Sequence, residues 1–212
     1  NFSGNFRDGS PNSNNGTCTG TACPSWNASG KYNGAYMFDG GDDYVDAGNS
    51  GSFNMTNSLT VSLWAKWNMF YNNSAGHALI SKANESSYDG FLVYQNTESP
   101  YNKIKSYVNN GSVVPPTFVS NQNLSTDTWY FVVLVYNGSN AGLYLNGILD
   151  ANTSNVSGNI QNSINPLLIG ASYSINSSQV NDAFFNGSID AVQICNRSLS
   201  ASEINQLYMS NL

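Results

Sequence analysis

The side chains able to carry out catalysis are few and lie far apart in this sequence. Cleaving a glycosidic bond takes two carboxylates about 5 to 10 Å apart, but Glu85, Glu98 and Glu203 stand singly and no strand-like run carries a Glu-x-Asp-x-Glu pattern. His77 is the only histidine, and a Ser-His-Asp or Cys-His arrangement would have to use it. It precedes the apolar run Ala78-Leu79-Ile80, which favours a structural role. No glycine-rich phosphate loop precedes a helix. The sequence therefore predicts no catalytic residues and no enzyme.

Aspartate is concentrated in one segment that contains Asp39, Asp42, Asp43 and Asp46. In an extended segment Asp42 and Asp46 lie on one side and Asp43 on the other, so the four carboxylates do not all converge on one ion. Ca²⁺ takes about six to eight oxygen ligands and accepts carbonyls among them. The simpler alternative is that these aspartates cap turns by accepting hydrogen bonds from backbone amides. The sequence leaves both interpretations open.

Aromatic side chains are abundant, with 4 Trp, 13 Tyr and 10 Phe. Those in strand-like runs, such as Trp64 and Phe131, are predicted to be core. Tyrosine has a flat apolar face and a polar tip, which suits stacking on a sugar ring. Four tyrosines in polar loops are therefore candidate ligand-binding residues: Tyr71, Tyr88, Tyr101 and Tyr173. The alternative is that they only cover the ends of the domain.

Amide and hydroxyl side chains replace the charge that this protein lacks. The chain has 34 Asn, and chance would place about 6 or 7 of them in an Asn-x-Ser/Thr acceptor sequence. It has 14, which favours N-glycosylation of a secreted or cell-surface protein over accidental turn sequences. The predicted acceptors are Asn1, Asn15, Asn27, Asn54, Asn72, Asn84, Asn110, Asn123, Asn137, Asn152, Asn155, Asn176, Asn186 and Asn196.

Charge and hydropathy exclude two classes of function. Charged residues make up 9% of the 212 residues and the net charge is −6, so no cationic surface follows a phosphate backbone and nucleic-acid binding is not expected. The longest apolar run, Trp129–Tyr136, is far shorter than a membrane span of about 20 residues. A coat of sugars would supply the solubility that few charges cannot.

The three cysteines fit an oxidising compartment only in part. Cys18 and Cys23 flank a short polar stretch and are predicted to form a small disulfide loop. Cys195, left over, is expected to be a small buried core residue. With one histidine and no second cysteine pair at ligand spacing, a zinc site is not expected.

Short apolar runs bounded by Gly, Asn, Ser and Asp predict an all-β domain. Trp129–Tyr136 is apolar on both faces, as in a central strand covered on both sides, and Asn146-Gly147 marks a hairpin. A capping box, Ser200-x-x-Glu203, begins the only convincing helix. No linker or repeat divides residues 1–212, so we predict one antiparallel two-sheet sandwich, a jelly roll. The predicted strands are Ala35–Asp39, Tyr44–Ala47, Ser58–Lys66, His77–Lys82, Gly90–Gln95, Lys103–Val108, Pro116–Ser120, Trp129–Tyr136, Ala141–Leu145, Ile148–Asn152, Leu167–Ala171 and Phe184–Cys195.

An ordered set of motifs resembles the laminin-G-like, concanavalin-A-like jelly rolls. The segment Tyr36–Asp46 resembles the family's F-D-G-x-D-D-Y-V signature, and Asn196–Ile204 resembles its closing strand and helix. The other matching segments are Leu59–Trp67, Leu79–Lys82, Asp127–Val133, Leu143–Gly147, Leu168–Gly170 and Phe185–Asp190. The resemblance covers nearly the whole chain and implies a recognition module, with calcium held by loop acids in some relatives.

Two departures from the family pattern matter. The opening segment Phe2–Asn5 resembles the family's, but an apolar strand usually precedes it, so most of the first strand is expected to be missing. Either the chain is part of a longer protein, or another subunit donates the strand and builds a polymer. Ser3 stands where the family usually has Asp, which weakens the calcium expectation. Since the family's first and last strands run close together, the calcium candidates implied by the resemblance are Asp39, Asp43, Asp182 and Asp190.

Three functions remain open from the sequence. The first is a glycosylated structural subunit of a cell-surface filament, coat or layer, with or without adhesion. The second is a lectin-like module that binds a glycan or a surface protein through rim loops. The third is an accessory domain of a larger secreted enzyme. None of them requires a cofactor, and calcium is the one candidate ion.

Overall fold

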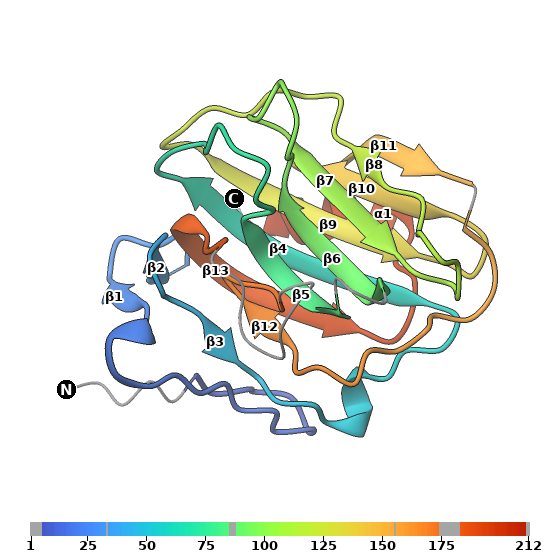
Figure 1. The fold of residues 1–212 in the computed structure, drawn as a ribbon, viewed down its shortest axis with the longest axis horizontal. Coiled ribbons are helices and arrows are strands. Elements are labelled where there is room, and N and C mark those ends of the chain that lie inside the picture. The colour runs from blue at the N-terminus through green and yellow to red at the C-terminus, as the bar shows by residue number, and fades with distance from the viewer. Residues whose placement is uncertain (1–5, 33, 85–87, 155, 174–182, 211–212) are drawn as a thin grey trace.

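The strands predicted from the sequence assemble into two antiparallel sheets that pack face to face (Figure 1). The computed structural model describes residues 6–32, 34–84, 88–154, 156–173 and 183–210. The seven-stranded sheet has the order β1 (Ser25–Asn27), β2 (Ala35–Asp39), β13 (Asn186–Cys195), β4 (Leu59–Trp67), β9 (Trp129–Tyr136), β10 (Ala141–Leu145) and β11 (Ile148–Thr153). The six-stranded sheet has the order β3 (Val45–Asp46), β12 (Leu168–Ile169), β5 (Ala78–Asn84), β6 (Asp89–Gln95), β7 (Ile104–Val108) and β8 (Phe118–Val119).

The main hydrophobic core lies between the two sheets and follows the two-residue period of the strands. In β4 the residues Leu59, Val61, Leu63, Ala65 and Trp67 all belong to it. In β9 the inward side chains are Tyr130, Val132, Leu134 and Tyr136. The predicted jelly-roll sandwich is therefore confirmed.

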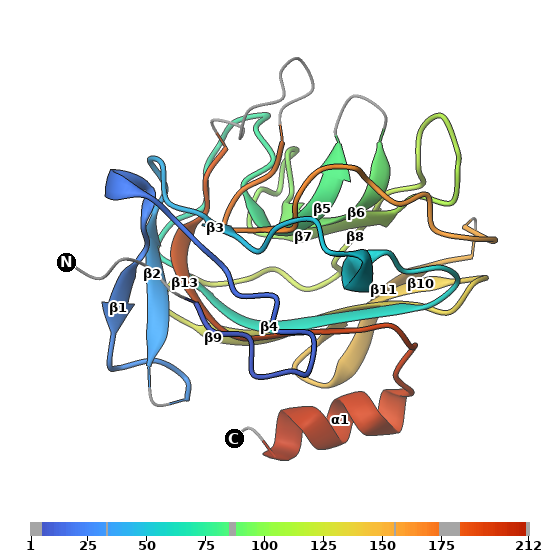
Figure 2. The same ribbon diagram turned by 90° about the horizontal axis from the view of Figure 1, so that it is seen from below.

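A second hydrophobic cluster covers the outer face of the seven-stranded sheet. The helix α1 (Ala201–Ser210) lies under that sheet in Figure 2. Its Ile204 belongs to the same cluster as Trp64 of β4. The outward residues of β9 complete that cluster: Phe131, Val133 and Val135. This explains why Trp129–Tyr136 is apolar on both faces: one face meets the other sheet, and the opposite face meets α1.

Local sequence signals begin the helix and form the turn of the hairpin where expected. The Ser200 side chain accepts a hydrogen bond from the Glu203 amide, and the Glu203 carboxylate accepts from the Ser200 amide, as in a capping box. Asn146 and Gly147 have φ of 50° and 82° between β10 and β11, which is the type I′ turn predicted.

Several elements differ from the sequence prediction. The edge strand β1 and two short 3₁₀ turns, η1 (Gly20–Ala22) and η2 (Gly51–Phe53), were not predicted because they are short and mostly polar. In addition, β3, β8 and β12 are only two residues long, because the chain leaves the sheet after two pairs of partners. These short strands lie toward the ends of the six-stranded sheet, where loops take over.

Candidate functional site

The aspartate-rich segment forms a turn at one end of the sandwich, between β2 and β3. Gly40 takes a left-handed φ of 78°, and a Cβ there would lie 2.2 Å from the Tyr71 hydroxyl, so the turn requires glycine. One oxygen of Asp39 accepts hydrogen bonds from the Gly41 and Asp42 amides at 2.7 and 3.3 Å. The turn-capping interpretation of Asp39 is therefore confirmed.

The same turn gathers three carboxylates. Carboxylate oxygens of Asp39, Asp42 and Asp43 lie within 4.8 Å of one another. The extended segment assumed from the sequence was wrong here, because Gly40-Gly41 bends the chain and brings Asp42 and Asp43 to the same place. The missed signal was this glycine pair directly after Asp39. We call these three residues the acidic turn.

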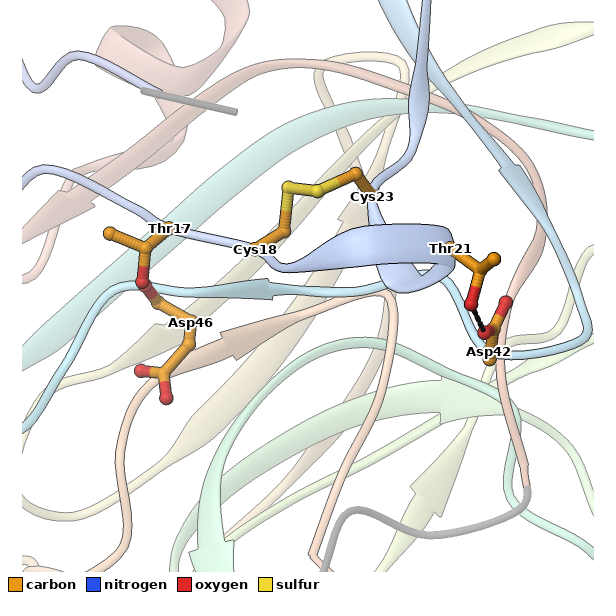
Figure 3. The surroundings of a disulfide bond; sticks show 6 residues. All are labelled: Thr17, Cys18, Thr21, Cys23, Asp42 and Asp46. Atoms are coloured by element: carbon orange, nitrogen blue, oxygen red, sulfur yellow. Dashed lines mark hydrogen bonds between the residues drawn. A yellow bond between two sulfur atoms is a disulfide. The ribbon is translucent and has the colours of Figure 1, made fainter. Parts of the chain in front are cut away.

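A small disulfide loop holds the acidic turn from the outside (Figure 3). Cys18 and Cys23 are bonded, as predicted, and η1 lies between them. From this loop the Thr21 hydroxyl donates to the Asp42 carboxylate at 2.7 Å, and the Ala22 carbonyl accepts from the Tyr44 amide at 3.1 Å. The disulfide loop thus fixes the position of the acidic turn.

The electrostatics of the acidic turn are unfavourable without a cation. Asp43 is 5% exposed, and its carboxylate accepts a hydrogen bond from the Asp39 amide at 2.8 Å. Burial, and then the charges of Asp39 and Asp42, raise the pKa of Asp43 to about 6, although the amide hydrogen bond opposes this. Among the described residues, neither ion pair involves these three carboxylates. The turn therefore carries excess negative charge that a cation would neutralise.

Polar and aromatic side chains flank the acidic turn. The Tyr71 ring stacks on His77 with centroids 3.8 Å apart, and its hydroxyl donates to the Gly40 carbonyl at 3.5 Å. The Asn186 side-chain amide donates to the Asp39 carbonyl at 2.8 Å and accepts from Asn68. The sequence marked Asn186 only as a glycosylation acceptor and did not mark Asn68, because no motif indicates that an asparagine lies beside a group of carboxylates.

The four loop tyrosines do not form one site. The antiparallel register places Tyr71, Tyr101 and Tyr173 at the same end as the acidic turn, and Tyr88 at the opposite end, in the β5–β6 connection. Tyr173 packs with Tyr44 against a cluster around Phe184, and burial raises the pKa of its hydroxyl. Of the four, Tyr71 is the one that contacts the acidic turn directly.

The calcium candidates are only partly brought together. Asp39 and Asp43 converge as expected. The third carboxylate beside them is that of Asp42, which was not among the four candidates. Asp190 lies along β13, and its two oxygens accept hydrogen bonds from the amides of Tyr32 and Ala191 at 2.8 and 2.7 Å. Asp190 is therefore bonded elsewhere, and three residues of β13 lie between it and Asn186. Asp182 lies outside the described residues.

The acidic turn has the chemistry of a calcium site. Ca²⁺ prefers carboxylate and carbonyl oxygens, and three carboxylates converge in this turn. Such a set supplies only part of a calcium shell of about six to eight oxygens. The residues therefore fit a calcium ion whose remaining ligands are water or oxygens of a bound molecule.

His77 contacts main-chain and amide oxygens. It is 4% exposed, with Nδ1 at 2.8 Å from the Phe184 carbonyl and Nε2 at 3.2 Å from Asn73 Oδ1. Burial lowers its pKa, so the neutral ring is favoured near pH 7. These contacts agree with the structural role predicted for it.

Cys195 differs from the prediction. It is a free thiol, as expected, but it is half-buried and lines an open cavity beside β13. The reason is that β13 pairs with β4 here on one side only, and no described strand pairs with it on the opposite side.

The acceptor asparagines divide into two groups. Asn1, Asn155 and Asn176 lie outside the described residues, and the side chain of Asn84 is not described. Three of the remaining ten are half-buried, and their Nδ2 groups donate a hydrogen bond to another residue of the protein: Asn27, Asn110 and Asn186. Seven are exposed and make no such donation among the described contacts: Asn15, Asn54, Asn72, Asn123, Asn137, Asn152 and Asn196.

No helix in the described part of the chain is long and apolar enough to cross a membrane. No curated protein sequence matches the chain.

Several solved structures with a similar fold are binding domains of larger proteins. The binding domain of Paraclostridial Mosquitocidal Protein 1 is similar with a TM-score of 0.73 and 15% identity, over 96% of this chain and 49% of that chain. The binding domain of botulinum neurotoxin serotype G gives 0.70 and 16%, over 96% and 48%. This chain thus spans about half the length of those two structures.

This chain covers a larger share of a third similar structure. Domain 4 of an extracellular arabinanase from Geobacillus stearothermophilus, in complex with arabinotriose, matches with a TM-score of 0.62 and 16% identity, over 91% of this chain and 83% of that chain. At these identities the likeness concerns the fold. The family model described as the Concanavalin A-like lectin/glucanases superfamily, of laminin G type, matches residues 39–205. The chain therefore belongs to the Concanavalin A-like lectin/glucanases superfamily.

Proposed function

We propose that this chain is a non-catalytic, extracellular recognition module that binds carbohydrate at the end of the sandwich formed by the acidic turn, with Ca²⁺ as a ligand of that turn. The observation that carries the proposal is the convergence of three carboxylates within 4.8 Å on a turn fixed by a disulfide loop. Bound calcium would neutralise the carboxylates and offer open coordination positions to the hydroxyls of a sugar.

The residues around the turn have defined tasks in this proposal. Asp39, Asp42 and Asp43 hold the ion, and the Asn186 and Asn68 amides present polar groups beside it. Tyr71 adds an aromatic ring whose orientation is fixed by stacking on His77. Polar groups that fix orientation, together with an aromatic surface, are what a small polar ligand requires. No step of bond cleavage is assigned to any of them.

The comparisons support this proposal at the level of fold. Two of the similar structures are binding domains, and a third is in complex with arabinotriose. The last belongs to an arabinanase, so an accessory role in a larger secreted enzyme is compatible with the same binding site. The ligand of this chain is an independent question.

A calcium titration followed by a glycan screen tests the proposal. We expect Ca²⁺ to bind with a stoichiometry of one and to raise the melting temperature, and EDTA to reverse the shift. We expect selective glycan binding only when calcium is present. No heat of binding and no change in melting temperature on adding Ca²⁺ would contradict the proposal.

A matched pair of substitutions locates the ion. Asp42→Asn keeps an oxygen that accepts from Thr21 but removes one charge, so calcium affinity should fall at least about tenfold. Asp127→Asn is the control, because Asp127 lies in another loop with φ of 57°, a conformation that asparagine also tolerates. Equal affinities for the two variants would place the ion elsewhere.

A second candidate function is a glycosylated structural protein of a cell-surface filament, coat or layer. The observation that favours it is that all ten described acceptor asparagines are exposed or half-buried, and seven leave Nδ2 without a described donation. Glycans on these seven would coat several loops and leave less surface for recognition.

Glycopeptide mass spectrometry of the protein from its source separates the two candidates. Asn72 follows Tyr71 directly, so a glycan there would cover the ring beside the acidic turn. A glycan on Asn72 favours the structural protein. An unmodified Asn72, which leaves the Tyr71 ring and the acidic turn uncovered, favours recognition. Among the other sites, we expect sugar on Asn54 and Asn137 and none on Asn186, whose Nδ2 is already bonded.

A further inference from the structure

One long edge of β13 has no neighbour over half of its length. On one side β13 pairs with β4 along most of the strand, ending with Cys195 opposite Thr60. On the other side β2 pairs only with Asn186–Ile189, so it accompanies one end of β13 (Figure 1). A bulge follows at Asp190, where Ala191 takes φ of 48°. The segment Gln193–Cys195 then continues with no described partner on that side.

This free edge has backbone groups without a described protein partner. In an antiparallel strand, successive residues direct their N–H and C=O groups to opposite sides. Alternate residues of Val192–Cys195 therefore point these groups away from β4, and no described backbone or side-chain group bonds to them there. Burying such groups without partners costs about 1 to 3 kcal/mol each, so an extended backbone is the partner that they fit.

An open cavity of about 980 Å³ lies against the free edge, and we call it the β13 groove. Both sheets contribute apolar walls: Val45 and Ile169 come from the six-stranded sheet, and Ile189, Val192 and Ile194 from β13. All five belong to the main core or pack against it. Protein cores contain few voids larger than a water molecule, whereas here the described residues leave this side of the core open to the surface.

The described chain does not supply that occupant. Phe6, the first described residue, exchanges both backbone hydrogen bonds with Gly16, at 3.1 and 2.8 Å, and its ring packs on Tyr36 with centroids 4.3 Å apart. Phe6 and Gly16 thus pair with each other at the wall of the groove and not with β13. The described residues from Phe6 to Ser210 leave the groove open.

The charges in the groove restrict the occupant further. Asp190 lines the groove, but its carboxylate oxygens are already bonded to the amides of Tyr32 and Ala191. The other charged lining residues, Arg7 and Asp8, are adjacent in sequence and of opposite sign. The rest of the lining combines apolar side chains with uncharged polar ones such as Asn12, Asn14 and Gln193, and it complements an uncharged segment rather than an ion.

We propose that the β13 groove binds an extended, uncharged segment of a second polypeptide chain, which adds as a strand beside Val192–Cys195 and inserts apolar side chains at alternate positions. The backbone of this segment satisfies the free edge, and its inward side chains complete the core. Strand addition of this kind joins subunits and is independent of the glycan site, because the groove and the acidic turn share no residue.

A synthetic peptide tests the proposal on the protein as it stands. The probe is acetyl-Thr-Val-Thr-Val-Thr-Val-Thr-amide, whose valines alternate as the groove requires. We expect it to bind with a stoichiometry of one, to raise the melting temperature by several degrees, and to slow alkylation of Cys195 at least about tenfold. No binding would overturn the proposal, including the case in which the chain's own residues fill the groove.

Two modified peptides separate strand pairing from apolar contact. One carries N-methyl groups on the three valines. The other carries them on three threonines, the two inner ones and the C-terminal one. Because an added strand uses the amides of one edge only, one of these peptides should lose binding and the other should retain it. If both bind as well as the parent peptide, or both fail alike, the backbone pairing is wrong.

A pair of substitutions then locates the peptide. Ile194→Lys places a charge in the groove and should weaken peptide binding at least about tenfold. The matched control, Ile148→Lys, changes a residue that is 69% exposed on β11, at the other edge of the same sheet, and should leave binding unchanged. Equal loss in both variants would overturn the assignment, and the N-methyl peptides keep the test valid if Ile194→Lys does not fold.

Discussion

The acidic turn and the β13 groove are two incomplete regions of one sandwich, and the first lacks a charge whereas the second lacks a strand. At the acidic turn, oxygen acceptors are crowded together and a positive charge is missing. At the β13 groove, apolar side chains and backbone groups line an open space, and a strand is missing. The sheets between them are densely packed, with Leu59, Leu134 and Leu143 fully buried.

The difference shows that one fold offers two kinds of binding. Loops at the end of the sandwich can change their polar residues without disturbing the sheets, so that end suits small polar ligands. The side of the sandwich exposes sheet edge and core, so it suits another polypeptide. In this protein the disulfide loop stiffens the first region, whereas β2 leaves the second region uncovered.

The largest expected effect contrasts the filled core with the groove. Leu134→Ala removes a fully buried side chain from β9 and should destabilise the protein by about 3 kcal/mol. Ile194→Ala removes a half-buried side chain that faces the groove, and the loss should stay below about 1.5 kcal/mol because little new cavity forms. Urea denaturation measures both values. A loss for Ile194→Ala equal to that for Leu134→Ala would mean that the groove is closed in solution.

The next effect concerns the charge at the acidic turn. Asp43→Asn removes a buried charge whose pKa is raised to about 6, so in EDTA at pH 7 the variant should be more stable by an amount on the order of 2 kcal/mol. An asparagine oxygen still accepts from the Asp39 amide. Adding Ca²⁺ should reverse the order of stability, because only the wild-type turn gains the ion's full set of carboxylates.

The control for this substitution is Asp127→Asn, which should change the urea midpoint little in either buffer. A variant Asp43→Asn that is less stable than wild type in EDTA would show that the carboxylate is satisfied without a cation. That result would remove the electrostatic argument for calcium while leaving the fold unchanged.

How much of this could be predicted from the sequence depended on how local each signal was. The strands, the hairpin at Asn146-Gly147 and the capping box at Ser200 are encoded by neighbouring residues, and they were found. The disulfide between Cys18 and Cys23 was found for the same reason. The acidic turn was only half found, because the conformation of Gly40 decides which aspartates converge.

The remaining features depend on distant contacts. Asp190 was expected near the other acids, but its position along β13 and the amides of Tyr32 and Ala191 fix it elsewhere. Cys195 was expected in a closed core, and the missing neighbour of β13 leaves it half-exposed to the groove. The shape and lining of the β13 groove could come only from the three-dimensional structure, because they depend on residues far apart in the sequence.

A smaller effect is the pH dependence of stability in EDTA. The pKa of Asp43 is about 6 when folded and near 3.8 when unfolded, so the folded protein binds more protons between these values. The Asp43 contribution to stability should therefore increase as the pH falls from 7 to about 4, by an amount on the order of 1 to 2 kcal/mol. Wild type should gain this much more stability than Asp43→Asn, because His77 and Asp190 titrate alike in both proteins. Thermal melts at intervals of half a pH unit measure it. Identical slopes for the two proteins would contradict the raised pKa.

The smallest expected effect is the coupling between the two regions. β13 joins them, with Asn186 at the acidic turn and Cys195 at the groove, about 30 Å apart along the strand. Sites this far apart without shared contacts usually couple by less than about 0.5 kcal/mol. Saturating Ca²⁺ should therefore change the alkylation rate of Cys195 less than about twofold, and the bound peptide should leave calcium affinity unchanged within the same factor. Stopped-flow maleimide labelling with and without Ca²⁺, repeated in Asp42→Asn, measures the coupling. A rate change of tenfold that disappears in Asp42→Asn would show that the strand transmits the binding of one ligand to the other, and that the two regions form a single switch.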